Sequence, residues 1–142
     1  MLRGQLIEAI AAGHDAGTAG AVQALALDPN VRAEEVHNLL ETYMYWPDNR
    51  AEGRAWMRRN KDRLLARVPA MWQGYTGWLY REGQCTDAEA QDFQRVWEKR
   101  LANVEGGPRN VAQAIEATRL CAALREKQSL TEFGKSLEVK GE

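Results

Sequence analysis

Few side chains in this 142-residue chain have the type and spacing that enzyme chemistry requires. The two histidines, His14 and His37, lie far apart and belong to no metal-binding spacing. The patterns H-E-x-x-H, C-x-x-C and G-x-S-x-G are missing, and so is a phosphate-binding glycine loop. Because general acid–base and metal catalysis depend on such residues, we predict no catalytic residue, no metal ligand and no cofactor in this chain.

The two cysteines, Cys85 and Cys121, can form at most one disulfide, or both can stay reduced. Free cysteine is among the most buried residue types, and both positions lie in apolar surroundings. We therefore expect two buried free thiols rather than a disulfide.

A basic stretch, Arg58, Arg59, Lys61 and Arg63, has the charge to contact an anion. An asparagine and an aspartate interrupt it, and this mixed pattern is typical of a solvated helix face. We expect the solvated face rather than an anion site.

The remaining candidates for ligand binding are aromatic or basic. Trp72, Tyr75 and Trp78 recur at a spacing of three and could form a platform for a ligand, although such a stripe is more often core. We expect these three residues in the core. Arg109, in a Gly-Gly-Pro-Arg turn, and Arg119, in the helix that follows, are our candidate binding residues.

Composition limits the class of protein. The 19 basic and 20 acidic residues leave a formal charge of −1, which gives no electrostatic argument for nucleic acid or an anionic membrane as partner. The sequence contains no run of about 18 apolar residues, so we predict no membrane span. The N-terminus lacks a secretory signal pattern. We expect one soluble domain, cytoplasmic or periplasmic depending on sequence upstream of this chain.

Apolar periodicity and turn residues predict eight or nine helices and no strand. The clearest start is the capping box Thr86-Asp87-Ala88-Glu89. The predicted helices span about Leu2–Ala12, Ala19–Leu27, Ala33–Tyr45, Arg50–Arg59, Lys61–Arg67, Met71–Arg81, Thr86–Asn103, Pro108–Leu124 and Ser129–Leu137.

The helix after Gly106-Gly107 is the best marked of these. Its proline stands at a first helical position, and its apolar residues follow steps of three and four. We expect it to be the inner helix of the structure, with Ile115 and Cys121 buried.

Helices of this length joined by short turns predict antiparallel neighbours. We expect an all-α fold in which successive helix pairs stack as an α-solenoid, with a closed bundle as the alternative.

Several short motifs, in their order and spacing, resemble the C-terminal end of zinc aminopeptidases of the aminopeptidase N, puromycin-sensitive and endoplasmic-reticulum type. The resemblance covers nearly the whole chain. It is carried by Ala24-Leu25-Ala26-Leu27-Asp28, the Val31–Leu40 helix, Trp56-(x)3-Asn60, Pro69, Cys85-Thr86, Gly106-Gly107-Pro108-Arg109, Gln113-Ala114-Ile115-Glu116 and Leu120-Cys121-Ala122-Ala123-Leu124.

The resemblance implies a HEAT-like helical domain that arches over a separate catalytic domain and encloses the peptide-substrate cavity. The family's zinc-binding H-E-x-x-H, its downstream glutamate and its G-A-M-E-N-type motif are missing from this sequence. We therefore expect zinc in the catalytic domain of a larger parent enzyme, and we expect this chain to be the last part of that enzyme. The alternative is a free-standing HEAT-like module for protein–protein interaction.

If helical repeats that come before this chain in the parent enzyme are missing, no helix packs on the outer faces of the first helices. The stretches Leu2–Ala12 and Ala19–Leu27 are rich in apolar residues on their outer faces, unlike the polar cap that a solenoid end needs. We therefore expect a homodimer through the N-terminal helices.

Overall fold

The computed structural model describes residues 2–127, and within them the chain forms seven α-helices and no strand. The helices are α1 (Leu2–Ala11), α2 (Ala16–Leu27), α3 (Ala33–Tyr45), α4 (Pro47–Arg67), α5 (Ala70–Arg81), α6 (Asp87–Leu101) and α7 (Gly107–Lys127). The prediction of an all-helical chain is confirmed for this part of the sequence. The predicted helix Ser129–Leu137 lies outside the described residues.

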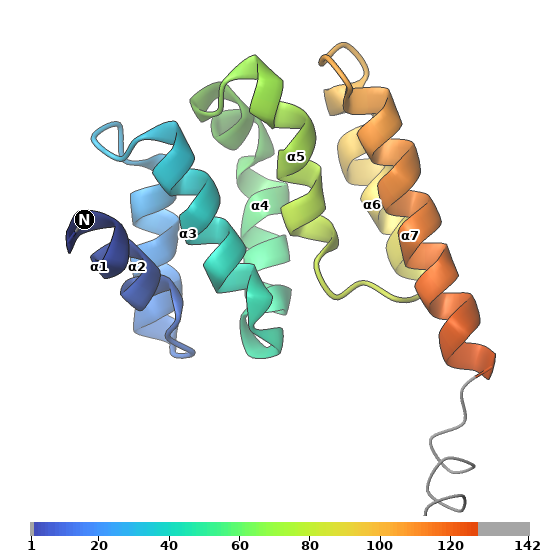
Figure 1. Cartoon of the computed structure of the whole chain (residues 1–142), viewed down its shortest axis with the longest axis horizontal. Helices are drawn as coiled ribbons and strands as arrows, with labels where there is room; N and C mark the ends of the chain where they lie inside the picture. Colours follow the sequence, from blue (N-terminus) through green and yellow to red (C-terminus); the bar gives the residue numbers. More distant parts are fainter. Residues whose placement is uncertain (1, 128–142) are drawn as a thin grey trace, which may run out of the picture.

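The helices are arranged in two layers (Figure 1). Helices α1, α3, α5 and α7 follow one another side by side in the nearer layer of this view, and α2, α4 and α6 lie behind them. Each helix also packs against the next one in the sequence, so the chain alternates between the layers. Contact within the second layer is close between α2 and α4, whereas α4 and α6 are separated by a groove.

Helix α4 is continuous where the sequence analysis expected two helices meeting at Asn60. The Asn60 amide donates to the carbonyl of Trp56, 3.1 Å away, without breaking the helix. Buried residues lie on both sides of it, Trp56 and Met57 before and Leu64 and Leu65 after. The stabilisation from packing both halves of α4 into the core outweighs the small free-energy cost of one asparagine inside a helix. The structure therefore has fewer helix breaks in this stretch than the sequence predicted.

The core is continuous along the array and is filled by aliphatic and aromatic side chains. At its C-terminal end Tyr80, Phe93 and Trp97 are buried together, with the Tyr80 and Trp97 ring centroids 5.8 Å apart. None of the helices formed by residues 2–127 is long and apolar enough to cross a membrane.

Helix α7 is the last helix of the described array rather than an inner one (Figure 1). It packs against α5 and α6 through a narrow stripe, Val111, Ala114 and Thr118. The expectation that Ile115 and Cys121 are buried is wrong, because both are only half-buried. Since no described helix covers the far side of α7, only one stripe of its apolar residues is enclosed.

The turn before α7 requires both of its glycines, as the sequence indicated. Gly106 has a φ of 68°, a conformation that L side chains rarely adopt. A Cβ atom on Gly107 would stand 2.1 Å from the Leu101 carbonyl oxygen. The chain can therefore reverse directly from α6 into α7.

Cys85 and Cys121 form a disulfide, which corrects the expectation of two free thiols. Cys85 lies in the loop between α5 and α6, and Cys121 lies in α7. They are 36 positions apart in the sequence, with the whole of α6 between them, and the packing of α7 along α6 brings the chain back to the loop that contains Cys85. Sequence separation gave no sign of this proximity.

Candidate functional site

The aromatic row of α5 does not belong to the core. Trp72 is 36% exposed and Tyr75 is 56% exposed, and Trp78 is half-buried. The prediction of a core stripe is therefore wrong for Trp72 and Tyr75.

Small residues explain why the aromatic face of α5 is turned outward. The buried face of α5 contains Gly74 and Gly77, where α6 and α7 approach closely. A Cβ atom on Gly74 would lie 2.5 Å from the Asn110 amide, and one on Gly77 would lie 3.2 Å from the Phe93 ring. Large side chains are excluded from this contact, so the aromatic residues face α3 and solvent.

Tyr75 and Trp78 line a cavity of about 370 Å³ between α3 and α5, which we call the aromatic groove. Its volume lies in the range of small-ligand pockets. At its edge the Trp72 and His37 rings meet in a T-shaped contact with centroids 5.1 Å apart. The groove is lined by His37, Glu41, Met44, Tyr45, Tyr75, Trp78, Leu79 and Glu82.

Of the two acids that line the aromatic groove, Glu82 is paired with an arginine. The Arg50 guanidinium lies 3.5 Å from the Glu82 carboxylate and donates to the carbonyls of Met44 and Tyr45. The Arg81 guanidinium lies 5.1 Å from the centre of the Trp78 ring, within cation–π range. The groove therefore suits apolar and aromatic groups better than a strongly charged ligand.

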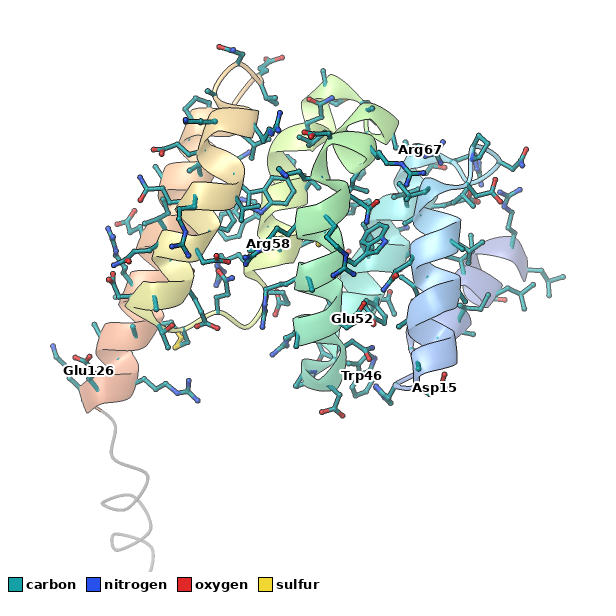
Figure 2. All side chains as sticks on the ribbon, turned by 180° about the vertical axis from the view of Figure 1, so that it is seen from behind. Asp15, Trp46, Glu52, Arg58, Arg67 and Glu126 are labelled. Carbon is teal, nitrogen blue, oxygen red and sulfur yellow. A yellow bond between two sulfur atoms is a disulfide. The ribbon has the colours of Figure 1, made fainter. Side chains whose placement is uncertain are left out.

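A second concavity, of about 570 Å³, lies in the other layer between α4 and α6, and we call it the arginine groove. Figure 2 views the molecule from this side and shows Arg58 on α4 directed toward α6. The groove is lined by Ala51, Arg54, Ala55, Arg58, Arg59, Tyr80, Gln84, Ala88, Glu89 and Asp92. Part of the basic stretch expected to be a plain solvated face thus lines a groove.

A hydrogen-bonded network crosses the floor of the arginine groove. Arg58 donates to the Tyr80 hydroxyl, 2.7 Å away, and to the Asp92 carboxylate. The Tyr80 hydroxyl donates to the same carboxylate at 2.6 Å, and Arg95 pairs with its other oxygen at 3.0 Å. The network links α4, α5 and α6.

The network shifts the acidity of its members. Burial, followed by the hydrogen bond to Asp92, raises the pKa of the Tyr80 hydroxyl above its ordinary value. Burial alone would raise the pKa of Asp92, but the hydrogen bonds from Tyr80 and Arg95 and the nearby guanidinium charges lower it overall. Asp92 is therefore held as a carboxylate.

The two arginines predicted as binding residues lie in neither groove. Arg109 is exposed in the first turn of α7, and it forms no ion pair within residues 2–127. Arg119 is exposed, as expected, and its Nε lies 2.9 Å from the Asp87 carboxylate. Sequence reasoning instead missed Arg54 and Gln84, although the spacing of Arg54 and Arg58 by four places them on one face of a helix.

His14 and His37 each contact a tryptophan, Trp46 and Trp72 respectively. Among residues 2–127 no group of three or more histidine, cysteine, aspartate or glutamate side chains is placed to hold a metal ion.

Comparison of the chain with protein-family models, with curated proteins and with solved structures finds no match. The resemblance to the aminopeptidase domain therefore stays a prediction from sequence motifs.

Proposed function

We propose that the seven helices form a short HEAT-like α-solenoid and that this chain is the non-catalytic C-terminal helical domain of a zinc aminopeptidase. The observation that carries the proposal is the arrangement of the helices in two layers (Figure 1). Each helix packs against the following helix in the sequence, and α1, α3, α5 and α7 also pack against one another in that order within the nearer layer. Helix pairs stacked in this manner build the extended surfaces that solenoids use for binding. The motifs that suggest the aminopeptidase family add to this support.

In this proposal the domain encloses a peptide-substrate cavity whose catalytic zinc is held by a separate domain. The aromatic groove is the surface we propose for peptide contact. Its exposed rings, Tyr45 at 66% and Tyr75 at 56%, offer apolar area with a polar tip, which is a common feature of binding surfaces. Exposed aromatic residues that gather in a groove indicate a binding surface more strongly than a single exposed apolar residue does.

The coding sequence upstream of Met1 gives the first test. We expect an open reading frame that continues into H-E-x-x-H. An in-frame stop codon directly before Met1 would contradict the proposal and favour the free-standing interaction module.

The second test uses the complete parent enzyme and measures kcat/KM for a long peptide and for a single-residue amide. Tyr75→Ala should lower the value for the long peptide roughly 2- to 10-fold, as loss of one aromatic contact predicts. The value for the amide should not change, because the amide does not reach this domain. Met71→Ala is the matched control, since Met71 is 70% exposed on the same helix but lies outside the aromatic groove. Equal effects of both variants on both substrates would contradict the assigned surface.

A further inference from the structure

The side of α7 that faces away from α5 and α6 has an apolar surface near its C-terminal end (Figure 1). Leu120 is 60% exposed and Leu124 is 50% exposed, and the two stand one turn apart on one face of the helix. No helix of residues 2–127 covers them, because α7 is the last helix of the described array. Neighbouring exposed leucines on one helix face indicate a contact surface.

A concavity of about 550 Å³ adjoins these leucines, and we call it the disulfide groove. Its walls come from the C-terminal half of α7 and from the loop after α5, and both cysteines of the disulfide belong to its lining. Apart from Arg125, no described lining residue carries a charge. The groove therefore suits an apolar side chain.

The sequence beyond α7 contains a segment with a matching pattern. Residues 128–142 lie outside the described part of the chain. Among them Leu130, Phe133 and Leu137 follow steps of three and four, which predicts one apolar stripe on a helix. Ser129 stands directly before this stretch and is of a residue type preferred at the N-cap. The sequence therefore predicts a short amphipathic helix that follows α7 after a two-residue link, Gln128-Ser129.

So short a link limits where this helix can pack. Antiparallel helices joined by about two to five residues form an αα-hairpin, in which residues equally far from the link lie at the same height. Phe133 is as far beyond the link as Leu124 is before it. Leu137 and Leu120 form a second such pair, one turn farther along. The apolar stripe of the segment thus matches the exposed leucines in register.

We propose that residues 129–137 fold back on α7 as a short antiparallel helix, which covers Leu120 and Leu124 and places Phe133 at the disulfide groove. A helix of this length that contains a glycine is unstable by itself, so it needs a partner surface in order to form. The chain alternates between two layers from α1 to α7, and this helix continues the alternation (Figure 1). It gives the helical array a cap at its C-terminal end. This inference goes beyond the proposed peptide contact and does not depend on it.

A second copy of the chain is the competing occupant of this apolar surface. The two-residue link holds the segment at an effective concentration on the order of millimolar. A second copy does not reach that concentration in an ordinary dilute sample. The tethered segment is therefore favoured over a second copy.

NMR on the complete chain tests the proposed contact directly. We expect nuclear Overhauser effects between the Phe133 ring and the Leu124 methyl groups. A sample that mixes isotope-labelled with unlabelled chains distinguishes contacts within one chain from contacts between two. The proposal would be overturned if these effects were missing, or if they arose between labelled and unlabelled chains.

Hydrogen exchange of the complete chain supplies a second, quantitative test. The backbone amides of residues 131–137 should exchange roughly tenfold more slowly than in an unstructured peptide. Phe133→Ser and Leu124→Ser should each abolish this protection, since each removes one side of the contact. Leu124 is not part of the core, so its variant should keep the fold of residues 2–127.

Val139→Ser is the matched control, because it makes a similar polar change in the same segment beyond the predicted helix. This variant should keep the protection of residues 131–137. Exchange at the unstructured rate in the unmodified chain would refute the proposal. Equal protection in Phe133→Ser and Val139→Ser would also refute it.

Discussion

A disulfide joins Cys85 to Cys121, 36 positions later in the sequence, with their Cα atoms 5.0 Å apart, so that the loop after α5 is fixed to α7. This loop also contains Gln84, which lines the arginine groove. The disulfide therefore connects the position of α7 with the shape of a groove on the other layer.

Removing the disulfide should lower the free energy of unfolding. Closing a loop of this length is expected to contribute about 3–4 kcal/mol by restricting the unfolded chain. We expect the double variant Cys85→Ser/Cys121→Ser to show a loss of that order in urea denaturation. The unmodified chain should show the same loss after reduction, and the double variant should not respond to the reductant. A chain that is equally stable with and without reductant would contradict the prediction.

The buried stripe of α7 can be located by substitution. Val111 is 5% exposed and Leu120 is 60% exposed on the same helix. Val111→Ala should lower the free energy of unfolding by about 1–2 kcal/mol through lost burial and a small cavity. Leu120→Ala should change it by about 0.5 kcal/mol or less. Denaturant midpoints that rank the two variants in the opposite order would show that the faces of α7 are assigned wrongly.

Glu35 should make stability depend on pH in the acidic range. Its carboxylate accepts from the side chain and the backbone N–H of Arg32, at 2.9 Å and 2.8 Å, and lies 3.1 Å from Arg3. The hydrogen bond from the Arg32 side chain, followed by that from its backbone, lowers the pKa of Glu35 from its ordinary 4.5 to about 2.

A lowered folded-state pKa means that the stabilisation is present above pH 4.5 and is lost as the pH falls toward 2. The unmodified chain should therefore exceed Glu35→Gln in stability near neutral pH, with the difference shrinking below pH 4.5. Denaturation of both chains at several pH values measures this difference. A difference that grows on acidification would have the wrong sign.

Apolar residues on α1 are exposed at the face where the sequence predicts a dimer contact. Leu2, Leu6 and Ile10 form one stripe on α1 and are 77%, 60% and 39% exposed. Leu6→Glu should shift sedimentation equilibrium from a dimer to the 16.0 kDa monomer and leave helicity unchanged. Gln5→Glu adds the same charge on the same helix and serves as control. A native chain that is monomeric at all concentrations would contradict the prediction.

Ile7 is unsuitable for that experiment, although it is the apolar neighbour of Leu6 in the sequence. It is 7% exposed and belongs to the core, so Ile7→Glu would bury a charge and destabilise the monomer itself. The difference between adjacent apolar residues becomes visible only when the neighbouring helices are in place.

Local chemistry in the sequence determined where most helices begin and end. The capping residue Thr86 accepts from the Glu89 N–H at 3.2 Å, as the motif predicted, although Glu89 reaches back to Cys85. Gly106 and Gly107 make the predicted turn before α7. Such signals involve atoms a few residues apart, so they act before any distant contact forms.

The tertiary structure alone decided which faces are covered and which distant residues meet. Close packing at Gly77 turned Tyr75 outward, and the return of α7 along α6 brought Cys121 to Cys85. Gln84 and Arg54 line one groove only because the loop after α5 lies against α4. Periodicity identifies an apolar stripe but does not say what covers it, because burial and charge pairing depend on neighbours far away in the sequence.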